Sequence, residues 1–204
     1  MGAVGDAAHG VLDACSAPVH PHQPELGRRH FSIGREVWIE RSDYEDVPPK
    51  GFFRLFPGNR VRLKYGHVIE CTGCTRLADG TLSEVHAILL PDTKSGTPGS
   101  DAVKVKGVIT WVAVADGIGA EVRLYDRLFT EPQPDAGGRD FLASLNPHSL
   151  KVVRAVVEPS LANAQRDDRF QFERHGYFVA DRVDHLPAKP VFNLAVSLKD
   201  SWSK

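Results

Sequence analysis

The sequence predicts a mostly β fold made of two small, closely joined antiparallel β-barrels with a few short helices. Three observations support this prediction. Short runs of β-forming residues recur along the chain, turn-forming residues separate them, and helical periodicity is rare. With 204 residues the chain is long enough for two small domains, and the strand runs divide near residue 105.

This division gives three segments. Residues 1–17 are rich in Gly and Ala and show no period, so we expect a poorly ordered lead. The first barrel is expected over residues 18–105. The second is expected over residues 106–204, and an exchange of strands between the two barrels is left open.

Strands are expected where β-forming residues alternate or cluster. In the first barrel these runs cover residues 36–40, 59–64, 67–75 and 82–90, with Asp79-Gly80 as a hairpin signal between the last two. The run 103–113 crosses the division between the barrels, and in the second barrel the runs cover residues 121–128, 150–157, 170–183 and 190–198. Short helices are expected at residues 139–145 and 160–165, and a loop at the Gly/Ser/Thr/Pro-rich residues 92–102.

Composition narrows the class of protein. Hydrophobic residues make up 42% and charged residues 25%, which is ordinary for a soluble globular protein. No apolar run reaches the roughly 20 residues of a membrane-spanning helix, and residues 1–15 lack the features of a secretory signal. Three cysteines argue against a disulfide framework, so we expect a protein of the reducing cytoplasm.

The net charge of −1 does not by itself indicate a nucleic-acid partner, so RNA binding would require cations gathered on one face. Alternation along three expected strands places cations together, opposite apolar residues. These cations are Arg60, Arg62 and Lys64 in one strand, Lys104 and Lys106 in a second, and Arg123 and Arg127, with Tyr125 between them, in a third. Such faces suit RNA phosphates and bases, although the simpler alternative for any one strand is a solvated sheet face.

Residues 170–174 form a less ordinary pattern. Phe170 and Phe172 would anchor in the core, so Gln171 and Glu173 would project together with Arg174 close by. These three polar groups supply donors and acceptors suited to reading the edge of an unpaired base. The alternative is an amphipathic strand with an exposed ion pair.

The sequence contains little that indicates an active site or a metal site. A zinc or redox role for Cys71 and Cys74 is not expected, because there is no second cysteine pair and the segment lies in a strand pattern. The sequence has no Gly-rich phosphate loop, no nucleophile elbow and no triad spacing. We therefore expect no catalytic residue, no metal site and no cofactor in this chain.

From about residue 20 to residue 202, the chain resembles the region that follows the catalytic domain in glutaminyl-tRNA synthetases. The motifs that carry the resemblance are Phe53-Arg54-Leu55, Val61-Arg62-Leu63-Lys64, the runs 104–112 and 121–129, Leu145-Asn146-Pro147, Glu158-Pro159-Ser160-Leu161, the run 171–178 and Val191-Phe192-Asn193. The resemblance implies two β-barrels that hold unstacked anticodon bases between and against them.

The resemblance also implies site residues and partners. By position, the base-contacting residues would be Arg54, Arg62, Lys64, Gln171, Glu173 and Arg174, with His22 in a loop near the RNA. The strand pattern adds Arg60, Lys104 and Lys106 as candidates for phosphate contacts. The implied partner is a tRNA, expected to be the glutamine tRNA, rather than DNA or a membrane. ATP and Mg would belong to a catalytic domain, which this chain lacks and which a separately encoded partner could supply.

The chain departs from the family pattern at several positions. Thr110 stands where the family usually has His, and Leu194 and Ala195 replace a usual Arg-Thr pair. Lys64 stands where Arg is often found, and Lys cannot make the same two-pronged contact. The nucleotide-binding signatures of class I synthetases are absent. Residues 1–17 show no clear counterpart of the family's first barrel strand, so the first barrel is expected to lack an edge strand.

The expected function is tRNA anticodon recognition as the C-terminal part of a glutamine–tRNA ligase. One alternative is the anticodon-binding part of a glutamate-specific synthetase. Others are an interaction protein that kept the fold but lost RNA binding, and an independent enzyme. The run 121–129 and Phe172-Glu173-Arg174 favour the glutamine type.

Overall fold

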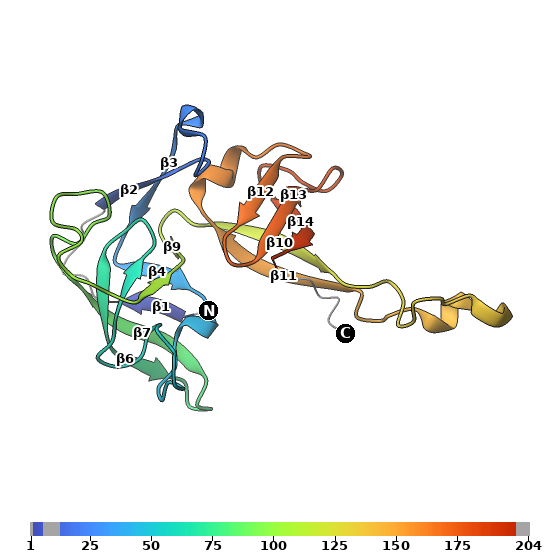
Figure 1. Ribbon diagram of the computed structural model, residues 1–204, viewed down its shortest axis with the longest axis horizontal. Coiled ribbons are helices and arrows are strands. Elements are labelled where there is room, and N and C mark those ends of the chain that lie inside the picture. Colours follow the sequence, from blue (N-terminus) through green and yellow to red (C-terminus); the bar gives the residue numbers. More distant parts are fainter. Residues whose placement is uncertain (1, 6–12, 199–204) are drawn as a thin grey trace. The chain divides into compact units, whose positions relative to one another are not determined.

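β-Strands are the main regular structure of the chain, as the computed structural model shows for residues 2–5, where only the backbone is described, and for residues 13–198 (Figure 1). The helices in these ranges are short 3₁₀ turns, and none is long and apolar enough to span a membrane. They are η1 Pro24–Leu26, η2 Arg41–Asp43, η3 Ala136–Gly138, η4 Phe141–Ser144 and η5 Pro159–Asn163. The prediction of a mostly β fold with a few short helices is confirmed.

The described residues form two compact units. The first holds those up to Ile118 together with Glu158–Ser160, and the second holds Gly119–Val157 and those from Leu161 onward. The division falls after residue 118 rather than near residue 105, because the strands at residues 107–113 pair within the first unit.

The first unit contains a seven-stranded sheet and a separate two-stranded one. The large sheet runs in the order β8 Gly107–Ile109, β5 Arg60–Leu63, β6 Val68–Arg76, β7 Leu82–Leu89, β1 Gly2–Gly5, β4 Glu36–Ile39 and β9 Trp111–Ala113. The small sheet is an antiparallel hairpin of β2 Asp13–Pro18 and β3 Arg28–Ile33.

Strands β1 and β2 show that the expected poorly ordered lead is wrong where the structure describes it; residues 6–12 lie outside the described residues. β1 pairs antiparallel with β4 and parallel with β7, so it lies inside the sheet. In β2, Cys15 and Ala17 are buried. The expected loss of an edge strand is therefore also wrong. Gly and Ala have side chains too small to give the polar–apolar alternation of a strand. The pairing of β1 is therefore determined by the backbones of its neighbours β4 and β7.

Within the described residues neither large sheet closes into a barrel, and this part of the fold prediction is wrong. The first sheet ends at β8 and β9. The sheet of the second unit runs β11 Leu150–Val157, β10 Ile118–Tyr125, β14 Val191–Ser197, β13 Gly176–Ala180 and β12 Arg169–Phe172. The pairings of β1 with β7, β5 with β8, and β10 with β14 are parallel. Alternation reveals strands but not their partners.

The two ends of the first sheet are consecutive in the chain. Only Thr110 separates β8, which pairs with β5, from β9, which pairs with β4. The strand expected from residue 103 begins at Gly107 instead. A Cβ at Gly107 would lie 1.8 Å from the carbonyl oxygen of Phe53, so this close approach requires glycine.

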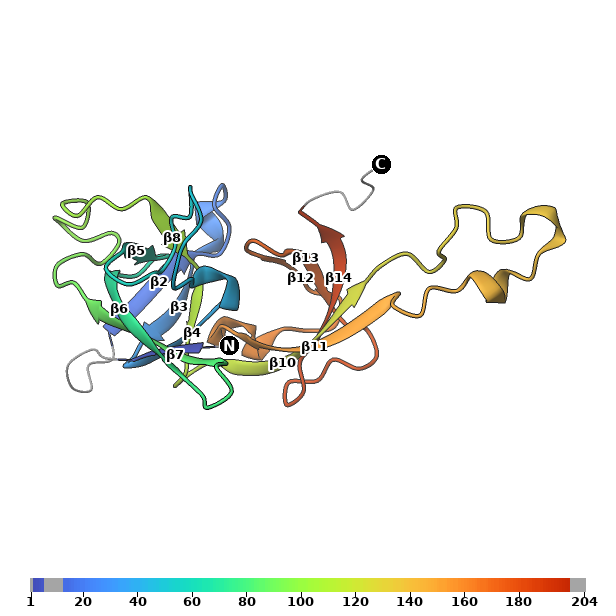
Figure 2. The same cartoon turned by 90° about the horizontal axis from the view of Figure 1, so that it is seen from below.

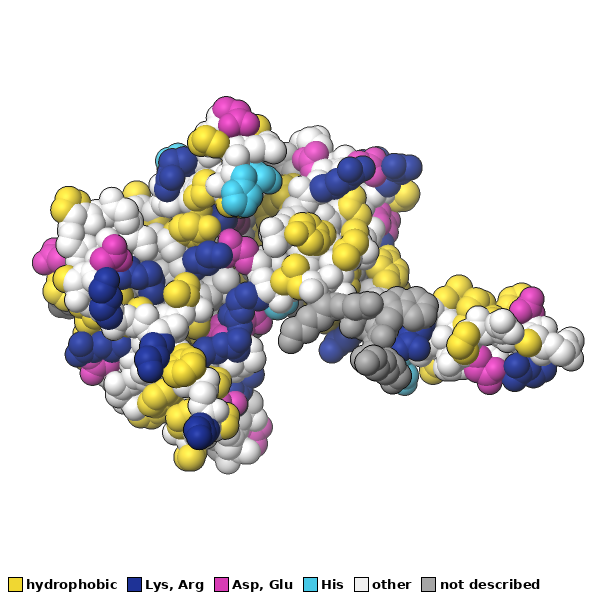
Figure 3. Space-filling model, in the orientation of Figure 1, with side chains coloured by type: hydrophobic (Ala, Val, Ile, Leu, Met, Phe, Trp, Pro, Cys, Tyr) yellow, Lys and Arg dark blue, Asp and Glu magenta, His cyan; other side chains and the backbone are white. Residues whose placement is uncertain are grey.

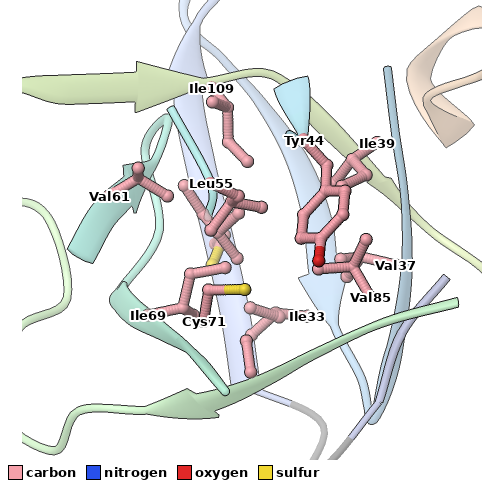
Figure 4. Packing of buried hydrophobic residues seen from close by; sticks show 13 residues of the cluster. Ile33, Val37, Ile39, Tyr44, Leu55, Val61, Ile69, Cys71, Val85 and Ile109 are labelled. Carbon is pink, nitrogen blue, oxygen red and sulfur yellow. The ribbon is translucent and has the colours of Figure 1, made fainter. Parts of the chain in front are cut away.

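The core of the first unit gathers side chains from most of its strands (Figure 4). Leu55 is fully buried in it, together with Ile109 of β8 and Val61 of β5. The ring of Tyr44 is buried in the same cluster, while its hydroxyl donates to Oδ1 of Asp46 at 2.7 Å. Burial, supported by hydrogen bonds to Cys74 and Asp46, raises the pKa of Tyr44.

An aromatic cluster forms the core of the second unit. Phe172 stacks on Phe178 with ring centroids 4.4 Å apart, and both Phe170 and Phe172 pack edge-on against the buried Phe192. The prediction that Phe170 and Phe172 anchor their strand in the core is confirmed. His185 is buried beside Phe192 and bonds to the backbone of Ala164 and Val191.

A long extension, residues 126–149, projects from the sheet of the second unit between β10 and β11 (Figure 2). It holds η3 and η4, and the Asp140 carboxylate caps η4 by accepting from the Leu142 N–H at 2.9 Å. The helix expected at residues 139–145 is thus a short 3₁₀ turn. Hydrophobic side chains remain exposed along the extension, from 42% at Leu145 to 57% at Leu128.

Leu55→Ala is expected to destabilise the first unit by about 2–5 kcal/mol, because it removes a fully buried side chain and leaves a cavity. Urea unfolding monitored by circular dichroism measures the change. Val47→Ala is the control, since Val47 is 87% exposed. Equal unfolding midpoints for the two variants would contradict the described packing.

Candidate nucleic-acid interface

Strand β5 carries the first group of predicted contact residues. Val61 and Leu63 are fully buried, whereas Arg60, Arg62 and Lys64 lie on the other side of the strand with at least partial exposure. The predicted division between an apolar face and a cationic face is confirmed here. In Figure 3, Lys and Arg side chains are spread over the visible face of the first unit among hydrophobic and acidic ones.

Arg62 uses its guanidinium to hold a loop. Nη1 donates to the carbonyl oxygen of Thr93 at 2.5 Å, and Nη2 donates to that of Ser100 at 2.7 Å. Nη1 also lies 3.3 Å from Oγ of Ser95. The fork that a base edge would need is therefore engaged with residues 93–100 in this chain, which sequence alternation could not reveal.

Arg54 is tied to a buried acid. Its Nη1 lies 3.1 Å from Oδ1 of Asp43, a residue with no exposed surface, and donates to the carbonyl oxygen of Ser42 at 3.0 Å. A buried carboxylate without such a partner would be costly. The other guanidinium nitrogens of Arg54 make no hydrogen bond to a described residue.

The phosphate-contact candidates differ in their surroundings. Arg60 is opposite Glu70 in the sheet and bonds to its carboxylate at 2.6 Å. Lys106 places its Nζ 5.3 Å from the ring centroid of Phe53, which is 51% exposed. Lys104 is exposed and makes no ion pair with a described residue. An exposed ring beside a lysine is the more RNA-like arrangement, and strand alternation gave no signal for Phe53 as a contact residue.

Lys64 and His22 occupy two other places in the first unit. The Nζ of Lys64 lies 5.4 Å from the ring centroid of Tyr65. His22 is exposed in the loop between β2 and β3, where its backbone N–H donates to Nδ1 of His20 at 3.2 Å. The two histidine rings meet edge-to-face with centroids 6.1 Å apart.

In the second unit, Gln171 is exposed on β12, but the strand ends one residue later at Phe172. Glu173 and Arg174 lie in the turn to β13, closed by a 2.9 Å bond from the His175 N–H to the Phe172 carbonyl oxygen. Arg174 has φ +71°, which interrupts a strand. The expectation that Gln171 and Glu173 share one strand face is therefore wrong.

On the third predicted cationic strand, Arg123 is neutralised by acidic side chains, and Arg127 lies beyond Tyr125, where β10 ends. Arg123 forms ion pairs with Glu121, Asp181 and Asp184 at 2.8, 3.2 and 2.6 Å. Bonds to Asp184 and Glu121 raise the pKa of Arg123. Bonds from the Asp184 backbone and the Asn193 side chain lower the pKa of Asp181 to about 2. Arg123 thus serves the second unit's own structure.

Neither a metal nor an active site emerges from the residues that the structure describes. No group of three or more His, Cys, Asp or Glu side chains there is placed to hold a metal ion. The three cysteines carry free thiols, and burial raises the pKa of Cys15 and Cys71. What the described residues offer is an exposed amide on β12 and exposed lysine and aromatic side chains in the loops beside β8, groups that can bind a ligand.

Comparison with known proteins defines the class. Two family models, both described as the anti-codon binding domain of class I tRNA synthetases (E and Q), match residues 3–89 and 108–181. The chain belongs to this family.

Its relatives are glutamine–tRNA ligases. The chain is 67% identical over 192 residues to that of Ralstonia nicotianae, covering 94% of the chain and 33% of the relative. It is 66% identical over 195 residues to that of Cupriavidus necator (96% and 33%) and 56% identical over 191 residues to that of Bordetella avium (94% and 32%). The chain thus spans about a third of the length of these curated relatives.

Arg62→Ala is expected to loosen residues 93–100, because the carbonyl oxygens of Thr93 and Ser100 lose their donor. Hydrogen exchange measured by mass spectrometry should rise at least severalfold over this loop and little elsewhere. Arg60→Ala is the matched control on the same strand, since its partner Glu70 lies outside the loop. Equal protection of the loop in both variants would remove Arg62 from this role.

Proposed function

We propose that the chain recognises the anticodon of the glutamine tRNA, as the C-terminal part of a glutamine–tRNA ligase acting in the cytoplasm. The observation that carries this proposal is the 67% identity to a glutamine–tRNA ligase across 94% of the chain. Because the match covers 33% of that relative, aminoacylation itself would reside in the other two thirds. ATP and Mg would bind there, whether that part is fused to this chain or encoded separately.

Phosphate contacts are proposed for Lys104 and Lys106. Both are exposed, and Lys106 lies over the exposed ring of Phe53. Single-stranded RNA binds well to surfaces that combine lysines with aromatic rings. Arg60 contributes less in this proposal, because Glu70 already compensates its charge.

Base contacts are proposed first for Gln171, whose side-chain amide is exposed and makes no hydrogen bond to a described residue. Glu173 and Arg174 in the adjacent turn, Lys64, and His22 in its loop complete the proposed set. Arg54 retains Nε and Nη2 for a base edge, since its protein contacts use Nη1. For Arg62 the proposal is a contact that depends on the loop it holds.

Glutamine rather than glutamate specificity follows, in this proposal, from the names of the relatives. Filter binding of glutamine and glutamate tRNA transcripts to the full chain tests it. Tighter binding of the glutamine tRNA is expected. Tighter binding of the glutamate tRNA would favour the glutamate-specific alternative, and binding of neither would favour an interaction protein that kept the fold alone.

Binding is expected to weaken steeply with salt despite the net charge of −1, because phosphate contacts release counterions. The double variant Lys104→Ala/Lys106→Ala should flatten the plot of log affinity against log salt by about 1.4, from roughly 0.7 per phosphate of a single strand. It should weaken cognate and anticodon-swapped tRNAs equally. Lys50→Ala/Lys151→Ala is the charge-matched control, and an identical slope for both double variants would refute the phosphate contacts.

Gln171→Ala is expected to cost about 1–3 kcal/mol on the cognate tRNA and much less on a tRNA with altered anticodon bases, since it removes a base-reading amide. Dissociation constants for both RNAs at one salt concentration give the answer. Gln133→Ala, an exposed glutamine on the extension, is the control. Equal losses on both RNAs would show that Gln171 is not a reader.

A further inference from the structure

We propose that Tyr177 forms the stacking surface on which one unpaired base of the anticodon loop lies, with its edge toward Gln171. This inference rests on the proposed function and adds a residue that sequence patterning did not select. It starts from strand register. Tyr177 on β13 is paired directly with Gln171 on β12 and with Val196 on β14.

Paired residues of antiparallel strands point to the same side of a sheet. Gln171 is exposed, Tyr177 is 49% exposed and Val196 is 59% exposed, so the three form a row on the solvent face of the second unit's sheet. The neighbours Phe172 and Phe178 point to the opposite face, where they stack in the core. The row is therefore an open shelf across three strands.

The backbone and the core beneath this row of three residues hold it in place. A Cβ at Gly176 would lie 2.5 Å from the carbonyl oxygen of Val196, so β13 and β14 approach closely beside Tyr177. The register shifts between Tyr177 and Phe178, and the stacked Phe172 and Phe178 rings lie beneath. A surface that is rigid before binding loses little conformational entropy when a ligand settles on it.

The chemistry of the row fits a nucleobase. A tyrosine ring offers a flat face that stacks on any base, and the adjacent Val196 extends the apolar surface. The Gln171 amide supplies one donor group and one acceptor for the base edge. The Tyr177 hydroxyl makes no hydrogen bond to a described residue, whereas that of Tyr125 donates to Asn193 at 3.2 Å. No hydrogen bond among the described residues thus requires the Tyr177 hydroxyl.

The test compares three substitutions in the full chain, using a glutamine tRNA transcript. Tyr177→Leu keeps an apolar side chain but removes the aromatic face, and should weaken binding roughly tenfold. Tyr177→Phe keeps the face and should bind within about twofold of the unaltered chain, because the hydroxyl is not used. Phe141→Leu, at an exposed aromatic residue on the extension of the same unit, is the control and should also stay within about twofold.

A second measurement identifies the contact directly. 2-Aminopurine replaces one anticodon-loop base at a time, and its fluorescence reports stacking. One position should be quenched on binding to the unaltered chain and to Tyr177→Phe, and should remain bright with Tyr177→Leu. If the unaltered chain binds tRNA but quenches at no position, or if Tyr177→Leu binds and quenches like it, the stacking role is overturned while anticodon recognition stands. If the unaltered chain binds no tRNA, the proposed function fails and this inference fails with it.

Discussion

The sheet of the first unit depends on one short segment that pairs with two different strands. Over residues 107–113 the chain pairs first with β5 and then, after Thr110, with β4, so the two ends of the seven-stranded sheet are covalently linked. β8 can take this position because Gly107, which has no Cβ, allows its backbone to lie in contact with the carbonyl group of Phe53. The same close approach brings Phe53 beside Lys106, the residue before Gly107, whose Nζ lies over the Phe53 ring.

Arginine and lysine have separate tasks in this chain. Arg54, Arg62 and Arg123 use their planar groups to satisfy buried carboxylates, loop carbonyl groups and clustered acids. Such multidentate contacts suit a guanidinium better than an ammonium group. Lys104 and Lys106 remain at the surface, where a solvated ammonium group keeps its charge available.

Much of the strand content could be predicted, because alternation is a local property. Residues 150–157 coincide with β11, and the anchoring of Phe170 and Phe172 is confirmed. Pairing could not be predicted: β1 is made of Gly, Ala and Val and acquires its place from β4 and β7. The engagement of Arg62 depends on carbonyl groups more than 30 residues away, which no local pattern encodes. The turn at Glu173–Arg174 was hidden because Glu173 continues the polar–apolar alternation of β12.

The position of β14 has a consequence for synthesis on the ribosome. This strand is the central member of the second unit's sheet, between β10 and β13, yet it is the last of the described strands to be made. Until residues 191–197 emerge from the ribosome, the strand that lies between β10 and β13 is missing, so these two strands cannot form one sheet. The cluster of Phe172 and Phe178 then also lacks Phe192. The second unit must therefore fold after its translation is nearly finished, and a nascent chain stopped before residue 191 would expose apolar strand edges to aggregation or degradation.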